Sequence, residues 1–103
     1  MPRIVVKGVT KEDLKNSSKE LLESVEKIIK RPKSSFTLDL LESTAILDGE
    51  EIKRVYVEIF WKERPLDVCR EVAEKIKEII KKSGYENIYV CFKNLDLEKE
   101  FIF

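Results

Sequence analysis

The two halves of this chain carry the same pattern of apolar residues at an offset of 51 positions. In each half a short β-rich run comes first, an amphipathic stretch with helical periodicity follows, and a second β-rich run completes the unit. Most matching positions are both apolar without being the same residue. They include Ile4 with Val55, Val6 with Val57, Leu21 with Val72, Val25 with Ile76 and Ile28 with Ile79. A repeat of this kind predicts a duplicated β-α-β unit.

Two stretches have apolar residues at three- and four-residue steps, the spacing of one helix face. The first follows Thr10, a predicted N-cap, and runs from about 11 to 30, where Pro32 marks its end. The second opens at Arg64-Pro65-Leu66-Asp67 and closes at Ser83-Gly84. Strands are expected at 4–6, 36–41, 52–61 and 88–92, with 45–47 as a candidate extension of the second strand and Asp48-Gly49 as a hairpin turn.

These elements predict one α+β domain over residues 1–103, with repeat halves at about 2–47 and 52–93 and a C-terminal tail at 94–103. Two helices on one face of a four-stranded mixed sheet would bury both apolar helix stripes. The same element order also fits a ferredoxin-like fold.

The sheet face away from the helices is expected to carry Tyr56, Phe60, Tyr89 and Cys91 around Glu58. That set is too apolar for a face fully in water, so we expect this face to pack against other copies of the chain. A carboxylate in such surroundings needs a partner, and for Glu58 we expect a structural ion pair with Arg54, Arg3 or an arginine from another subunit.

The balance of charge limits the partners of the chain, because 20 basic residues oppose 20 acidic ones. The chain lacks the net positive charge that would attract nucleic acid or an anionic membrane. No window approaches the ~18 apolar residues of a membrane span. We therefore expect no nucleic-acid partner, no membrane association and a cytoplasmic location. The many Glu and Lys residues, without any Gln, resemble the composition of thermophile proteins.

The absence of histidine removes Ser-His-Asp and Cys-His nucleophiles, His-ligated zinc and imidazole acid/base chemistry together. Cys69 and Cys91 lack the spacing of a metal knuckle or redox pair, so both are expected to be free thiols buried in the fold. No metal and no cofactor is expected. Pro2 is the best available base, because removal of Met1 would leave a secondary amine whose pKa falls with burial or a nearby cation.

Beyond Pro2, the sequence resembles the tautomerase superfamily, to which macrophage migration inhibitory factor and 4-oxalocrotonate tautomerase belong. Met1-Pro2 leads directly into a strand, and Arg31-Pro32 stands where the migration-inhibitory-factor branch has Lys-Pro. Ile88-Tyr89-Val90-Cys91-Phe92 resembles the Val-Tyr-Ile-Asn-Tyr strand of that branch, with cysteine in place of asparagine. The run from Val57 to Trp61, followed by Arg64, is more similar to an uncharacterised bacterial branch.

The resemblance implies a cofactor-free homotrimer that acts as a keto-enol tautomerase on a small enol or α-keto carboxylic acid. Pro2 would be the catalytic base, Arg31 would bind the carboxylate, and Tyr89 would donate a hydrogen bond in a neighbouring subunit's pocket. Arg64 is a second candidate for the carboxylate, since a guanidinium can grip a carboxylate through two parallel hydrogen bonds.

A second class of function is a non-catalytic, oligomeric interaction or ligand-binding module in which Pro2 is vestigial. Each site residue has a matching structural interpretation. Pro2 would begin an edge strand, Arg31 would complement a helix dipole, Arg64 would be a solvated loop residue, and Tyr89 would pack across a subunit boundary.

Overall fold

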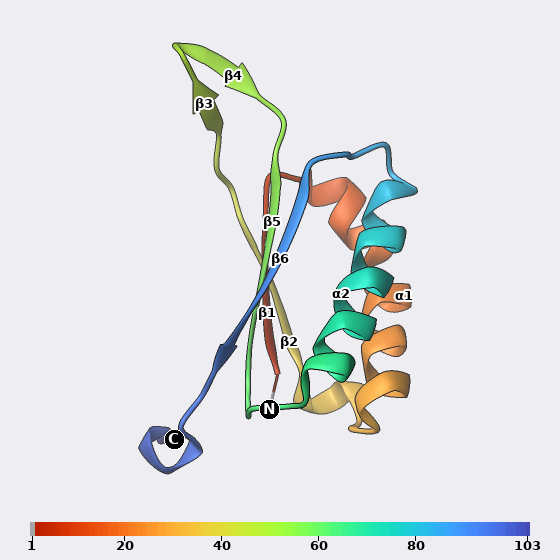
Figure 1. The fold of residues 1–103 in the computed structure, drawn as a ribbon, viewed down its shortest axis with the longest axis vertical. Coiled ribbons are helices and arrows are strands. Elements are labelled where there is room, and N and C mark those ends of the chain that lie inside the picture. Colours follow the sequence, from red (N-terminus) through yellow and green to blue (C-terminus); the bar gives the residue numbers. More distant parts are fainter. Residues whose placement is uncertain (1) are drawn as a thin grey trace.

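The structure of this protein is a computed structural model, and it describes residues 2–103. The elements in chain order are β1 (Arg3–Lys7), α1 (Lys11–Ile29), η1 (Lys33–Ser35), β2 (Thr37–Leu41), β3 (Ala45–Leu47), β4 (Glu50–Ile52), β5 (Val55–Trp61), α2 (Leu66–Lys81), β6 (Ile88–Asn94) and η2 (Leu97–Lys99) (Figure 1).

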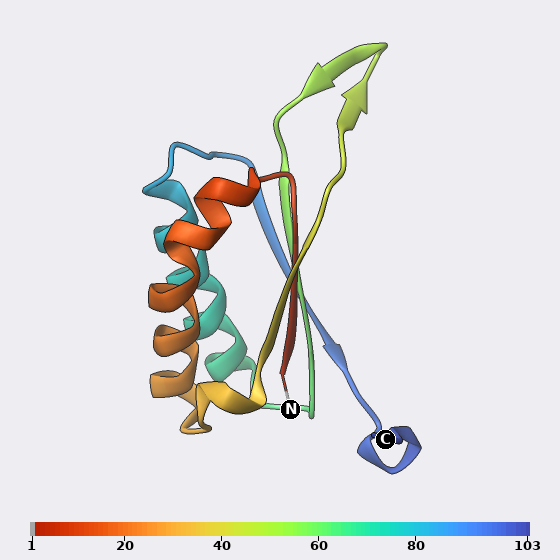
Figure 2. The ribbon, with the colours of Figure 1, turned by 180° about the vertical axis from the view of Figure 1, so that it is seen from behind.

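Four strands form one mixed sheet in the order β2-β1-β5-β6. Strands β1 and β2 are parallel, β5 and β6 are parallel, and the two inner strands β1 and β5 are antiparallel. Each parallel pair is joined through one helix, and both helices cover the same face of the sheet (Figures 1 and 2). The α+β class, the duplicated β-α-β unit and the two-helix layer are therefore confirmed.

The core lies between that sheet face and the two helices. Along β5 the side chains alternate, so that Val55, Val57, Ile59 and Trp61 are buried and the residues between them lie on the other face. The helices contribute Leu14, Leu21 and Val25 from α1 and Val72, Ile76, Ile79 and Ile80 from α2. This alternation leaves the face away from the helices, here called the open face, uncovered in a single chain.

The first helix begins and ends where the sequence predicts. The Thr10 side chain accepts a hydrogen bond from the Asp13 backbone N–H at 3.1 Å, and Lys30 adopts a left-handed conformation, with φ of 57°, just after the last turn. The Tyr85 hydroxyl donates to the Asp13 carboxylate and accepts from the Thr10 N–H, which fixes the start of α1 against the loop after α2.

Two strands start later than the sequence predicts. The strand expected at 36–41 starts at Thr37 and ends at Leu41 as expected, but 45–47 does not extend it and forms β3 of a separate hairpin with β4 that projects beyond the sheet (Figure 1). Asp48 and Gly49, with φ of 51° and 81°, form its predicted turn. The main strand starts at Val55 and not at 52, because the chain passes from the hairpin to the sheet at Lys53-Arg54. No helix within residues 2–103 is long and apolar enough to cross a membrane.

Candidate functional site

Pro2 lies at the end of the sheet where β1 begins. Its carbonyl accepts a hydrogen bond from the Thr37 N–H at 3.1 Å, and continuation of the β1–β5 register places it opposite Trp61. Less than 2% of the Pro2 side chain is exposed. Pro2 stands two residues before Ile4, whose side chain is buried under the helices. Side chains two apart in a strand lie on the same face, so the Pro2 ring is also on the helix side of the sheet. The predicted removal of Met1 concerns a residue outside those that the structure describes.

Arg64 lies in the turn that connects the same end of β5 to α2. Its guanidinium carbon is 4.6 Å from the centre of the Trp61 ring, and its Nη1 donates to the Lys62 carbonyl at 3.1 Å. Burial is the main cause that lowers the pKa of Arg64 below its ordinary value, and the positive charge of Arg31 lowers this pKa further. The two predicted carboxylate binders are thus neighbours in the folded chain.

Some cations of the described chain have carboxylate partners, whereas others, among them Arg31, Arg54, Arg64 and Arg70, do not. Arg3 pairs with Glu100 at 3.1 Å and Lys33 pairs with Glu23 at 3.0 Å. Within residues 2–103, neither Arg31 nor Arg64 has a carboxylate oxygen within 4 Å. Two adjacent positive charges without a counter-charge attract an anion, and the planar guanidinium fork matches a carboxylate.

The space beside Arg64 is a shallow hollow of ≈ 470 Å³, lined by Glu63, Arg64, Pro65, Leu66 and Cys69. The Cys69 Sγ lies 3.8 Å from the Arg64 carbonyl oxygen, with the geometry of a weak hydrogen bond. Burial raises the pKa of the Cys69 thiol, although the charge of Arg64 opposes this rise. The thiol is therefore protonated at neutral pH and does not supply a nucleophilic thiolate.

Tyr89 lies near the other end of the sheet, away from Pro2 and the two arginines. It pairs with Tyr56, and the two rings stack with their centres 5.2 Å apart. Tyr56 also pairs with Lys7, which places this aromatic pair roughly 17 Å along β1 from Pro2. Tyr89 can thus reach a site around Pro2 only from another copy of the chain.

Glu58 occupies the centre of the open face and has the ion pairs that its position requires. Its partners within the chain are Lys7 at 3.3 Å and Lys93 at 3.4 Å, so the expectation of Arg3 or Arg54 is wrong. The reason is the strand register, which brings these two lysines from β1 and β6 to either side of the carboxylate. The hydrogen bond from Lys7 is the main cause that holds the pKa of Glu58 below its usual value.

Both cysteines are free thiols, as predicted, but the expectation that both are buried is wrong for Cys91. Cys91 pairs with Glu58, and the alternation of β6 turns its side chain to the open face, where it is exposed in a single chain. Cys69 is half-buried at the start of α2.

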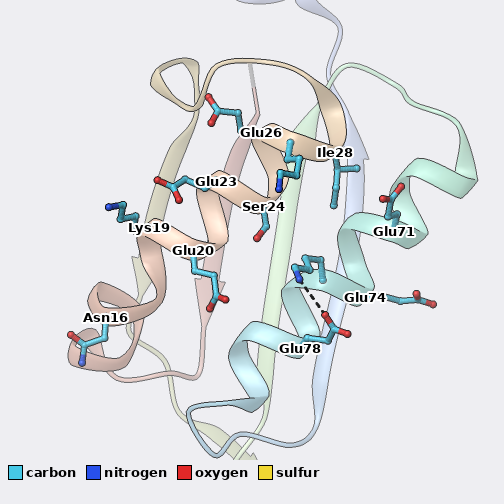
Figure 3. A pocket seen from close by; sticks show the side chains of 12 residues that line it. Asn16, Lys19, Glu20, Glu23, Ser24, Glu26, Ile28, Glu71, Glu74 and Glu78 are labelled. Carbon is cyan, nitrogen blue, oxygen red and sulfur yellow. Dashed lines mark ion pairs between the residues drawn. The ribbon is translucent and has the colours of Figure 1, made fainter.

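A groove between the outer faces of α1 and α2 is the other notable hollow (Figure 3). Its lining is mostly glutamate and lysine: Asn16, Lys19, Glu20, Glu23, Ser24, Glu26, Lys27, Ile28, Glu71, Glu74, Lys75 and Glu78. Lys75 pairs with Glu78 at 3.7 Å. Mixed charges on exposed helix faces are typical of a solvated surface, so we place the candidate site at Pro2, Arg31 and Arg64 instead.

The sequence analysis did not identify the contact of Trp61 with Arg64 at this end of the sheet. The signal was present, because Trp61 and Arg64 stand at either end of the turn that opens the second helix. A contact across a turn, however, depends on backbone geometry that periodicity does not give.

The two β-α-β units and their shared layer of helices define a tautomerase-like fold. A crystal structure of a macrophage migration inhibitory factor-like protein from Entamoeba histolytica is 17% identical to the chain, covers 98% of this chain and 94% of that chain, and has a TM-score of 0.82. A structure described as the Q0 fused 4-OT wild type symmetric trimer is 17% identical, covers 91% of this chain and 84% of that chain, and has a TM-score of 0.72. The predicted resemblance to the tautomerase superfamily is therefore confirmed at the level of the fold.

The chain belongs to the family described as "Domain of unknown function (DUF1904)", whose model matches residues 1–101. A crystal structure of a DUF1904 domain from Sebaldella termitidis ATCC 33386 is 26% identical to the chain, covers 99% of this chain and 95% of that chain, and has a TM-score of 0.91. Among curated proteins no match was found.

Proposed function

We propose that this protein is a cofactor-independent tautomerase that acts on a small enol or α-keto carboxylic acid, with the Pro2 amine as general base. One observation carries the proposal: a buried proline at the start of β1 lies at the same end of the sheet as two adjacent arginines. Those arginines have no acidic partner within residues 2–103. Burial and nearby positive charge both disfavour the protonated amine, so both lower its pKa towards neutrality.

The proposed reaction moves one proton and needs no cofactor. The Pro2 nitrogen accepts the proton of the enol hydroxyl, and the resulting ammonium delivers a proton to the neighbouring carbon of the C=C bond, which yields the ketone. The arginines hold the carboxylate and stabilise the negative charge that develops on the enolate oxygen as the proton leaves.

We propose further that three copies of the chain form the active assembly. The open face of each copy exposes Tyr56 and Tyr89, to 39% and 54%, and an apolar terminus ends at Phe103. A protein of the same fold is described as a symmetric trimer. In such an assembly Tyr89 of one copy would reach the Pro2 site of the next and hydrogen-bond the substrate oxygen.

Blocking the amine is the sharpest test of this function. Purified native chain should carry no Met1 by intact mass and should ketonise phenylenolpyruvate, with a rate that rises with pH through one apparent pKa. A chain with one residue added before Pro2 has an amide at that nitrogen, which cannot accept a proton, so ketonisation should fall to the uncatalysed rate.

The control is Pro2→Ala, which keeps a primary amine with a pKa of ~7.7 to 8.0 and should retain partial activity. Circular dichroism and sedimentation must show that the extended chain is folded and assembled as the native chain is. If the extended chain ketonises phenylenolpyruvate as fast as the native protein, Pro2 is not the base. The alternative function, a non-catalytic interaction module, would then be favoured.

A further inference from the structure

The β3–β4 hairpin carries unpaired carboxylates next to exposed apolar side chains. Residues 45–52 include three acidic residues and no basic one: Asp48, Glu50 and Glu51. None of the three has an ion pair within residues 2–103. Leu47 is opposite Glu50 and Ala45 is opposite Ile52, so these four side chains share one face of the hairpin, and Glu51 lies on the other. One face therefore combines three apolar side chains with a single carboxylate.

The opposite end of the molecule is complementary to that face. The stretches 30–33 and 62–64 contain five basic residues against one acidic residue, Glu63. Arg31 is exposed there and has no carboxylate oxygen within 4 Å in the described part of the chain. Leu66, at the start of α2, is an exposed apolar side chain at the same end. Such a surface suits an acidic segment that also has an apolar face.

The hairpin cannot reach this surface in its own chain. The molecule is 42 Å long, and the hairpin and the start of α2 lie at opposite ends of it (Figure 1). In the assembly proposed above, Tyr89 of one copy lies at the Pro2 end of the next. Tyr89 pairs with Tyr56, which follows the hairpin by four residues, so the same arrangement brings the hairpin of that copy to the same end of its neighbour.

The hollow beside Arg64 is open on one side in a single copy. Its described lining comes from one stretch of the chain, between Glu63 and Cys69, and a docked hairpin would supply the missing wall. The charges would then match a ligand with one carboxylate. Arg31 and Arg64 carry two positive charges, one hairpin carboxylate offsets one of them, and one positive charge remains.

We infer that the β3–β4 hairpin of one copy docks on the Arg31 end of the next, with Glu50 paired to Arg31 and Leu47 packed against Leu66. This inference rests on the assembly in the proposed function and on none of its catalytic steps. It gives Arg31 a role between subunits, leaves Arg64 to face the ligand, and makes each site depend on two copies. The packing also removes two exposed leucine side chains from water.

Cross-linking between copies tests where the hairpin lies. In a chain with Cys69→Ser and Cys91→Ser, Asp48→Cys is placed at the hairpin turn, and Glu63→Cys is placed in a second batch of the same chain. Both positions are exposed. After the two batches are mixed and reassembled, a short bismaleimide should link one chain of each kind, as resolved by mass. Lys77→Cys, exposed elsewhere on α2, is the matched control and should link little.

Stronger linking of Asp48→Cys to Asp39→Cys than to Glu63→Cys would overturn the inference. Asp39 lies in the edge strand β2, so that result would mean that the hairpin extends a neighbouring sheet instead. Equal linking to Glu63→Cys and Lys77→Cys would overturn it as well.

A charge swap tests the ion pair between Glu50 and Arg31. Glu50→Lys and Arg31→Glu should each raise the concentration at which the assembly dissociates about tenfold in sedimentation at low salt, because each places like charges in contact. The double variant should return to within about threefold of the native value. Glu51→Lys, on the other face of the hairpin, is the matched control and should change that concentration less than about threefold. A double variant as weak as the two single changes combined would overturn the pairing.

The inference and the proposed function fail in different ways. Linking to Glu63→Cys and rescue by the charge swap, together with no ketonisation of phenylenolpyruvate, would leave the docked hairpin standing and remove the tautomerase function. Ketonisation that depends on the Pro2 amine, in an assembly with neither the link nor the rescue, would do the reverse.

Discussion

At the scale of single residues, Glu58 explains how the open face tolerates a carboxylate among aromatic rings. Lys7 and Lys93 approach its two oxygens from the neighbouring strands, and only 22% of its side chain is exposed. The lowered pKa of Glu58 means that the folded chain holds the ionised form more strongly than the unfolded chain does. Folding stability therefore depends on pH through this residue.

Glu58→Gln should lower the free energy of unfolding at pH 7 by about 0.5–1 kcal/mol, because it removes the charge that both lysines meet. The folded-state pKa is depressed, so this contribution is present above the unfolded value near 4.5 and is lost as pH falls through the folded one. Urea unfolding at fixed protein concentration should show that the free energies of unfolding of native protein and Glu58→Gln become equal by about pH 3.

The control for that measurement is Glu98→Gln, because Glu98 is exposed and has no ion pair within residues 2–103. The free energy of unfolding of Glu98→Gln should equal that of the native protein at every pH. A difference between native and Glu58→Gln that is the same at pH 3 as at pH 7 would show that the lysine contacts do not set the stability.

At the scale of elements, the junction between β1 and α1 depends on one close approach. Gly8 has φ of 92°, and a Cβ at that position would lie 2.0 Å from the Arg54 carbonyl oxygen. That oxygen is part of the backbone just before β5, so it cannot rotate away as a side chain would. The turn after β1 and the backbone that enters β5 therefore constrain each other's conformation.

Gly8→Ala should destabilise the fold by about 2–4 kcal/mol, from a strained left-handed alanine plus a backbone overlap that both strands must absorb. Gly84→Ala is the matched control: Gly84 has φ of 94°, but nothing lies within 4 Å of its added Cβ, so only about 1 kcal/mol of strain is expected. Guanidinium unfolding of the two variants measures the difference. Equal destabilisation would mean that the Arg54 contact is not a constraint.

The sequence was sufficient for the elements whose residues follow a period. The stripes of α1 and α2 and the alternation of β5 predict their own burial, and Asp48-Gly49 predicts its hairpin. What could not be predicted depends on register and turn geometry. The lysine partners of Glu58 follow from how β1 and β6 align with β5, which no single strand specifies. Cys91 lies on the open face as alternation predicts, and it is exposed because nothing covers that face in a single copy.

The candidate site divides in the same way. Pro2, Arg31 and Arg64 were identified from chemistry and resemblance, and the structure brings the two arginines together, while their roles and that of Pro2 stay predictions. Trp61 was not identified, because an apolar residue of period two in a strand gives no sign that its ring supports a guanidinium.

At the scale of the whole molecule, a single copy leaves much apolar surface uncovered. The β3–β4 hairpin and the C-terminal segment project from opposite ends of the chain (Figure 1), and each carries exposed apolar side chains. Ile46 and Leu47 are 63% and 59% exposed in the hairpin, and Phe101 and Ile102 are 77% and 81% exposed in the tail. An isolated hairpin is marginal in water, so we expect neighbouring copies to cover these parts.

The protein should therefore sediment as a trimer at micromolar concentration. Tyr56→Glu places a second carboxylate near Glu58 on the open face and should shift the boundary to monomer, because burying an unpaired charge between copies is unfavourable. Lys77→Glu, an exposed change on α2, should remain trimeric. A native monomer, or a trimer indifferent to Tyr56→Glu, would remove the basis for placing Tyr89 in a neighbouring site.

The antiparallel pairing of β1 with β5 also has a consequence for how the chain folds as it is made. Arg3 pairs with Phe60, so the strand synthesised first lacks its inner neighbour until more than half of the chain has left the ribosome. The first β-α-β half then exposes one edge of β1 and the apolar side of α1, and a hydrophobic edge of that kind invites association with other chains. Contacts so distant in sequence also slow the search for the native state. We therefore expect a nascent chain stalled before Val55 to resist compaction and bind chaperones, and one released after Phe92 to collapse in a single cooperative step.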